Sequence, residues 1–212
     1  MVKALLTKTI FCFAMVGLLT LASCNKEEEI PHAATLDRTA LMAVAFPDWK
    51  ASDGKTIQAI ELPINSGGKQ APTGSKTRSE ILPLYVVRLN ESQAVMLTQA
   101  LAVDSSGEAL ACHACPGYVG AYSFTRYPAG WRLTARQDAV TTVGLEGTLG
   151  KTQIVRFGEN GFLFSANWGS CWQGYCRQWL ALLSLQPDRA IPYAPDLLLS
   201  AENTGAHEEC DS

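Results

Sequence analysis

The sequence ACHACPGYVGAYSF, residues 111–124, joins a pair of cysteines to a run of aromatic and β-prone residues. Pro116 and Gly117 separate the two parts, and this pair prevents a helix from continuing past the cysteines. Tyrosine, valine and phenylalanine then dominate, and these residue types have high strand propensity. We therefore expect a strand at residues 118–126 and a sheet as the framework of the chain that follows.

Other short β-prone runs lie on both sides of this stretch, separated by polar or glycine-containing turns. Residues 90–92 and 128–130 have the length and composition of hairpin turns. The runs are residues 56–62, 81–89, 93–101, 131–136, 152–157, 161–168 and 175–185, with an edge strand at residues 197–199. Consecutive short strands of this kind predict an antiparallel meander, folded either as a curled sheet or as a sandwich.

One helix is expected near the N-terminus of this body, over residues 36–46. Its apolar residues fall near helical spacing, and Thr35 can cap it through the hydroxyl group, while Pro47 ends it. The predicted fold class is thus α+β, mostly β, with one N-terminal helix packed on an antiparallel meander sheet.

Two further segments are predicted to be loops. Residues 65–80 contain almost no large apolar side chain and should form an exposed, mobile loop. Residues 142–150 carry Gly144, Gly147 and Gly150 at intervals of three, but they lack the strand-then-helix context of a phosphate-binding loop.

The length of 212 residues suits a single globular domain, which we place at residues 35–200, followed by an acidic tail at 201–212. Charged residues make up only 17% of the chain. A low charged fraction is compatible with a protein of the cell envelope.

The first residues have the features of a signal peptide. Lys3 and Lys8 precede an apolar core at residues 10–21, and this core is too short to span a membrane as a helix. The series Leu21-Ala22-Ser23-Cys24 resembles the lipobox of bacterial lipoproteins. This resemblance implies that residues 1–23 are removed and that Cys24 becomes a lipid-modified N-terminus, with a diacylglyceryl group and usually an added acyl chain such as palmitate.

The same resemblance predicts where the protein resides. Asn25, in place of Asp after the lipid-modified cysteine, implies transfer to the outer membrane, with the body facing the periplasm. Residues 24–34 are charged and contain Pro31, as expected of a tether. Without residues 1–23 the chain has 15 basic and 20 acidic residues, a net charge of −5, which does not suit nucleic acid binding.

Five cysteines remain after Cys12 and Cys24 are set aside, and outside the cytoplasm they are expected to form disulfides. Cys171 and Cys176 should face each other at a hairpin tip. Cys112 and Cys115 have three open interpretations: a structural staple, a thiol-disulfide exchange site, or part of a zinc site together with the other pair or His113. Cys210 has no evident partner.

No constellation of catalytic residues is evident, so we expect no catalytic residues, metal site or cofactor. The histidines lie in the tether, between two cysteines and in the tail, which leaves few candidates for a catalytic triad. Four acidic residues are expected in turns, facing solvent: Glu91, Asp104, Glu108 and Asp138.

The function predicted from these features is that of a non-enzymatic lipoprotein that binds another envelope component or stabilises an assembly. The body, residues 112–185, loosely resembles uncharacterised bacterial envelope proteins, which implies no activity. One alternative is a thiol-disulfide oxidoreductase that uses Cys112 and Cys115. Another is a small-molecule binder whose site contains the aromatic residues Trp131, Trp168, Trp172, Trp179 and Tyr175.

Overall fold

The computed structural model describes residues 30–63, 70, 72–110, 112–159, 161–203 and 205. The predicted signal peptide, Cys24, most of the predicted tether and Cys210 lie outside the described residues. No helix within the described part of the chain is long and apolar enough to cross a membrane.

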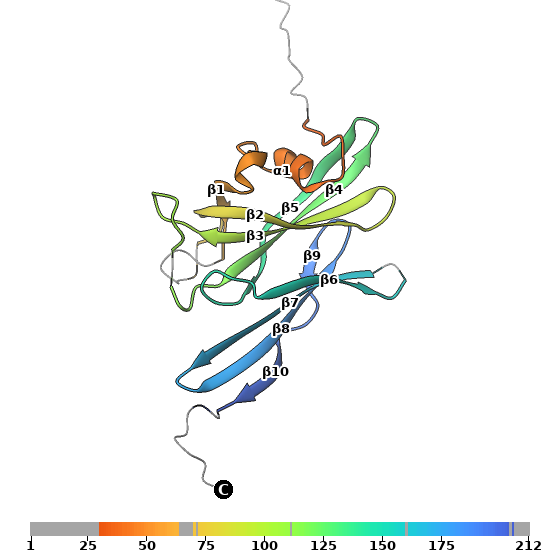
Figure 1. Cartoon of the computed structure of the whole chain (residues 1–212). Coiled ribbons are helices and arrows are strands. Elements are labelled where there is room, and N and C mark those ends of the chain that lie inside the picture. Colours follow the sequence, from red (N-terminus) through yellow and green to blue (C-terminus); the bar gives the residue numbers. More distant parts are fainter. Residues whose placement is uncertain are drawn as a thin grey trace, which may run out of the picture.

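The described strands form two antiparallel sheets, shown in Figure 1. The first is a meander in the order β1-β2-β3-β4-β5, and it is curled. The second has the order β10-β8-β7-β6, with β9 also paired to β8. The elements are α1 (Arg38–Ala45), a 3-10 turn η1 (Ala51–Asp53), β1 (Thr56–Glu61), β2 (Lys76–Arg88), β3 (Gln93–Ala102), β4 (Gly117–Tyr127), β5 (Gly130–Val143), β6 (Lys151–Phe157), β7 (Gly161–Trp172), β8 (Tyr175–Leu185), β9 (Ala190–Pro192) and β10 (Leu197–Glu202). The predicted class, α+β and mostly β, is confirmed.

Strand β4, which follows the cysteine pair, is buried on both faces and pairs with β5, the last strand of the first sheet. Tyr118, Tyr122 and Phe124 point into a core shared with α1. Val119 and Ala121, one residue out of phase, point into a second core shared with the other sheet. Because side chains alternate between the two faces of a strand, this one strand contacts both layers of the molecule. Burying each large side chain contributes about 1.5–3 kcal/mol to stability.

The helix α1 covers one face of the first sheet with Leu41, Met42 and the following Phe46, which are fully buried. Asp37, and not Thr35 as predicted, is the N-cap: its carboxylate accepts a hydrogen bond from the N–H of Ala40, 3.0 Å away. The Thr35 hydroxyl donates to the same carboxylate. The shift by two residues arises because a carboxylate at the cap position also interacts favourably with the helix dipole.

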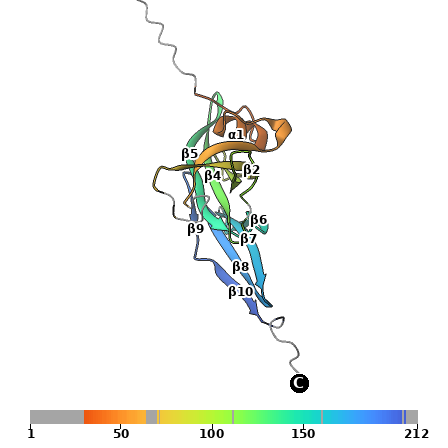
Figure 2. The same ribbon diagram turned by 90° about the vertical axis from the view of Figure 1, so that its left-hand side faces the viewer.

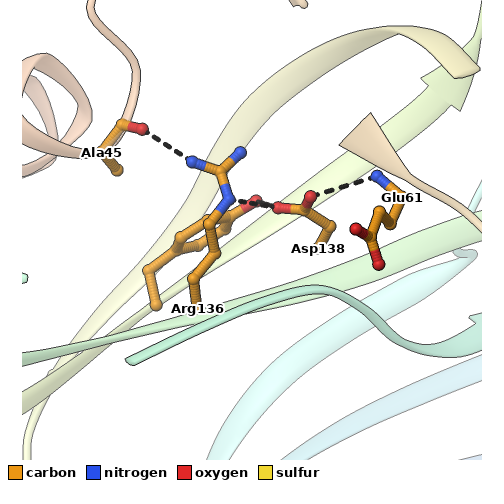
Figure 3. Close-up of polar contacts among 5 residues, drawn as sticks. Ala45, Glu61, Arg136 and Asp138 are labelled. Carbon is orange, nitrogen blue, oxygen red and sulfur yellow. Dashed lines mark hydrogen bonds and ion pairs between the residues drawn. The ribbon is translucent and has the colours of Figure 1, made fainter. Parts of the chain in front are cut away.

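Arg136 of β5 fastens the C-terminal end of α1 to the sheet (Figure 3). Its guanidinium donates a 3.0 Å hydrogen bond to the carbonyl of Ala45, the last residue of the helix. The same cation lies 5.0 Å from the ring centroid of Phe46 and 5.2 Å from that of Tyr122. A cation at this place interacts favourably with both the helix dipole and the two aromatic rings.

Asp138 completes this network, which we call the clamp: Arg136, Asp138, Tyr122 and the backbone groups of Ala45 and Glu61. Its carboxylate accepts from Arg136 at 2.6 Å, from the Tyr122 hydroxyl at 3.0 Å and from the N–H of Glu61 at 3.1 Å. The expectation that Asp138 faces solvent in a turn was therefore wrong, since the residue lies on β5 with a side chain that is 12% exposed. It joins β5 to β1, at the far side of the curled sheet.

Several element bounds differ from the sequence-based expectations. Lys76–Glu80 belong to β2 and pair with β1, although they were predicted to be loop. Backbone pairing holds this polar segment in a strand, and of its side chains only that of Ser79 is buried. At the other end of the chain, β7 extends to Trp172 and β10 to Glu202, so both strands are longer than predicted.

The second sheet packs on the first over only part of its length. Phe164 and Ala166 of β7 and Ala181 and Leu183 of β8 contact the first sheet. Beyond them β7, β8 and β10 continue away from the body (Figure 1), and the side view in Figure 2 shows the same extension. We call this projecting part, residues 167–180 and 197–202, the arm.

Candidate functional site

The face of the arm that continues the buried core carries an unusual set of aromatic residues. Trp168 is paired with Trp179, and Trp172 with Tyr175, in the antiparallel register of β7 and β8. Leu198 of β10 lies opposite Trp179. Since positions two residues apart in a strand share a face, these residues extend the row that begins with Phe164 and Ala166. We call these five residues the aromatic face.

Much of the aromatic face is open to solvent. Trp172 is 61% exposed, Tyr175 54% and Leu198 57%. The rings of Trp168 and Trp179 stack with their centroids 4.4 Å apart. Apolar side chains scattered singly over a surface are common, but a contiguous exposed apolar patch marks a site of interaction.

Polar groups at the edge of the aromatic face add charge to it. Arg177 lies between the two aromatic pairs, opposite Ser170. Asp196, just before β10, lies near Trp168, and burial raises the pKa of its carboxyl. The face therefore presents both an aromatic surface and ionisable groups.

The tip of the β7–β8 hairpin is closed by a covalent bond. Cys171 and Cys176 are register partners with their sulfur atoms 2.12 Å apart, as expected from their position in the sequence. The turn residues Gln173 and Gly174 both have positive φ, at 49° and 81°, as in the two-residue turns that match the twist of paired strands. The bridge and the turn together hold the register of the tip.

The second cysteine pair forms a small closed loop. The sulfur atoms of Cys112 and Cys115 are 2.03 Å apart, and the N–H of Cys115 donates to the carbonyl of Cys112 at 3.0 Å. Strand β4 starts two residues later, at Gly117, so no helix begins at this pair. The pair thus lacks the helix N-terminus that lowers the pKa of the reactive thiol in many thiol-disulfide exchange proteins.

His113 of this loop links it to the arm. Its Nδ1 lies 2.9 Å from Oε1 of Glu146, and its ring centroid lies 5.3 Å from that of Trp172. The loop is also tied to the glycine-containing segment, because the N–H of Gly147 donates to the carbonyl of Cys115 at 2.8 Å. Three segments that are distant in the sequence therefore meet at the base of the aromatic face.

Gly150 allows the glycine-containing segment to approach β7 closely. It has a φ of +71°, and a Cβ atom placed on it would lie 2.3 Å from the carbonyl oxygen of Asn167. The predicted loop is confirmed from Gly144 to Gly150, whereas Thr142 and Val143 belong to β5. Its glycines are used for close packing and for positive φ angles, which residues with a side chain rarely adopt.

A cavity of about 250 Å³ opens where these segments meet. His113, Glu146, Thr148, Trp168 and Ser170 line it, among others. It lies beside the aromatic face and forms part of the same surface. With an aromatic wall and a carboxylate at its edge, it can hold an inserted side chain.

A second cavity, of about 560 Å³, lies beside the clamp and is less suited to ligand binding. Its lining includes Arg136 and Asp138, which bond to each other, and Gln137, whose amide makes two hydrogen bonds to the backbone of Ala190. The side chains of Arg136, Gln137 and Asp138 are therefore already engaged in holding the fold together.

The zinc interpretation has no support in the arrangement of ligands. All four cysteines proposed for it are paired with each other at disulfide distance. Within the described residues, no group of three or more His, Cys, Asp or Glu side chains is placed to hold a metal ion.

Of the five aromatic residues predicted for a small-molecule site, the structure brings together Trp168, Trp172, Trp179 and Tyr175. Trp131 lies apart from them: it is 3% exposed in the core under α1. Leu198 and Glu146 were not predicted for the site. The run of three leucines at residues 197–199 was a usable signal, because such a run cannot be buried on one face of an edge strand.

No known family model, curated protein or solved structure matches this chain.

Proposed function

We propose that the protein is a lipid-anchored lipoprotein of the cell envelope that binds another envelope protein through the aromatic face and catalyses no reaction. The observation that carries this proposal is the exposure of Trp172, Tyr175 and Leu198 on a surface that continues the hydrophobic core. Aromatic residues are enriched at the centres of protein–protein interfaces, where each buries a large area at low entropic cost.

The orientation of the molecule supports this proposal. The first described segment begins near the β4–β5 hairpin, where Ala33 forms an antiparallel bridge with Trp131, whereas the arm extends at the opposite end (Figure 1). A lipid on Cys24 would hold the first end near the membrane. On an outer-membrane lipoprotein that faces the periplasm, the aromatic face would then point away from the membrane, toward other envelope components.

The anchoring part of the proposal is tested by Cys24→Ser. Wild-type protein should incorporate labelled palmitate and fractionate with the outer membrane. The variant should remain an unprocessed precursor without label, because the thiol that accepts the diacylglyceryl group is absent. Normal processing and membrane attachment of this variant would contradict the assignment.

The binding part is tested by photo-crosslinking in intact cells. A photoreactive phenylalanine analogue at Tyr175 should give a discrete crosslinked protein band, because this residue lies on the aromatic face. The matched control is the same analogue at Ala129, which is exposed in the turn between β4 and β5 at the other end of the molecule. Bands of equal strength from both positions, or none from Tyr175, would refute the proposed face.

A further inference from the structure

The arm also has an unpaired strand edge. Strand β10 is the last in its sheet and pairs only with β8, so half of its backbone N–H and C=O groups point away from the sheet. Among the described residues, no backbone hydrogen bond joins β10 to any strand other than β8. Such a row of groups is a template for another extended chain.

The other strand edges carry protection that β10 lacks. At the edge of β1, the N–H of Glu61 is bonded to the Asp138 carboxylate. Where the edges of β5 and β9 meet, the Gln137 amide of β5 bonds to both the N–H and the carbonyl of Ala190 in β9. Strand β6 has Lys151 and Arg156 along its edge, and charged side chains, especially those of lysine, discourage edge pairing.

Strand β10 has the sequence LLLSAE, with no lysine, arginine or proline. Its three leucines are 45%, 57% and 49% exposed. Its register changes at Leu199, which has no partner on β8. An exposed apolar edge without basic residues or proline is the kind of strand that recruits another chain.

The leucines lie on both faces of the edge, which restricts what can bind there. Leu198 lies opposite Trp179, on the aromatic face, whereas Leu197 lies opposite Leu180, on the other face. An added strand would therefore contact apolar side chains above and below the sheet. Its own residues should be apolar in succession, and not only at alternate positions.

Charge distinguishes a different partner from a second copy of this chain. Acidic residues stand at both ends of the edge, Asp196 before it and Glu202 at its end. Antiparallel pairing of two copies of β10 would bring Asp196 of one copy close to Glu202 of the other at both ends, and like charges across paired strands are destabilising. The cation on the neighbouring strand, Arg177, lies one strand inward, opposite Ala201.

We propose that β10 binds an extended segment of the partner protein, added as a further strand, in which several successive apolar residues are flanked by basic ones. This inference rests on the proposed function, since it specifies how the arm engages its partner. Backbone hydrogen bonds supply the pairing, Leu197, Leu198 and Trp179 receive the apolar side chains, and the two carboxylates favour the basic ends.

The probe is a fluorescein-labelled peptide, Lys-Ile-Val-Ile-Val-Lys, titrated with mature acylated protein in detergent and followed by fluorescence anisotropy. It should bind, and the version with glutamate at both ends should bind about tenfold more weakly. Two N-methylated versions, each blocking the N–H groups on one edge of the peptide, separate strand addition from general apolar contact. Only one of the two should lose binding, because an added strand uses only one of its edges.

Leu199→Pro is the matching change in the protein, with Leu199→Ala as control. Proline is tolerated at bulges and on edge strands, and Leu199 pairs with no residue of β8, so the fold should remain intact. The proline removes an N–H and obstructs the edge, so peptide binding should be lost, whereas the alanine variant should bind within about threefold of the wild type.

Three results would overturn the inference: no binding of the lysine-flanked peptide, equal loss with both N-methylated peptides, or full binding by Leu199→Pro. A dimer in analytical ultracentrifugation that Leu199→Pro converts to monomer would assign the edge to a second copy and overturn it too. If the peptide results fail while the Tyr175 crosslink persists, the proposed function stands and only the strand-addition mode falls. Loss of the crosslink with intact peptide binding would instead count against the aromatic face.

Discussion

Removal of the Asp138 carboxylate should destabilise the protein strongly, because it accepts hydrogen bonds from three other members of the clamp. In Asp138→Ala the hydroxyl of Tyr122, a fully buried residue, loses its hydrogen-bond acceptor. Leaving a buried polar group unsatisfied costs about 1–3 kcal/mol. The N–H of Glu61 loses a bond that contributes about 1 kcal/mol.

The ion pair between Arg136 and Asp138 adds less. The Arg136 side chain is 36% exposed, so solvent screens the attraction, and its contribution is at most about 1 kcal/mol. Together the three losses predict a decrease of about 2–5 kcal/mol in the free energy of unfolding. This is a large part of the stability of an ordinary domain.

The measurement is urea denaturation followed by tryptophan fluorescence, with Glu91→Ala as a control at an exposed turn residue. The control should change the free energy of unfolding by less than about 0.5 kcal/mol. Should Asp138→Ala fail to fold, Asp138→Asn keeps the shape of the side chain and an oxygen that can accept from Tyr122, and it removes the charge that pairs with Arg136.

A double-mutant cycle with Tyr122→Phe separates the hydrogen bond from the other losses. Because phenylalanine leaves no hydroxyl to satisfy, Asp138→Ala should cost about 1–2 kcal/mol less in the Tyr122→Phe background than in the wild type. Additive effects of the two substitutions, or a cost of Asp138→Ala no larger than that of Glu91→Ala, would refute the clamp as a source of stability.

Three further outcomes are expected. Burial, with a smaller contribution from the charge of Asp138, raises the pKa of Tyr122, so the folded state holds this proton more tightly than the unfolded state. The stability that this tighter binding contributes is present below about pH 10 and is lost as the pH rises above it. In urea titrations, the free energy of unfolding should therefore fall less between about pH 9 and pH 11 in Tyr122→Phe than in the wild type. Gly150→Ala should destabilise the protein more than Gly158→Ala in thermal melts. Both glycines have positive φ, which costs a residue with a side chain about 1–2 kcal/mol, but only at Gly150 would the added Cβ also clash with β7. Replacing both Cys112 and Cys115 by serine should lower the free energy of unfolding by about 2 kcal/mol without loss of any thiol-disulfide exchange activity. If the wild type reduces insulin and this variant does not, the protein is instead a thiol-disulfide oxidoreductase.

Features that depend on neighbouring residues could be read from the sequence. The alternation of apolar and polar residues, the short polar turns and Pro47 predicted most strands and the single described helix in nearly the right places. The pairing of Cys171 with Cys176 followed from their position at a hairpin tip, since the turn alone brings the two together. Even the edge strand at residues 197–199 was predicted, although its extension to Glu202 was not.

Features that depend on distant segments were decided only by the tertiary structure. Asp138 and Glu146 resemble any other polar residue near a turn, but the curl of the first sheet brings Asp138 to β1, and the packing of three loops brings Glu146 to His113. The aromatic residues show the same limit: Trp131 and Trp172 have equal propensities, yet one lies in the core under α1 and the other on the open arm. Which face of a strand is buried depends on the length of the layer packed against it, and here the second sheet extends beyond the first. The chain sequence therefore determined the strands, and the difference in extent between the two sheets determined which of their side chains remain available to a partner.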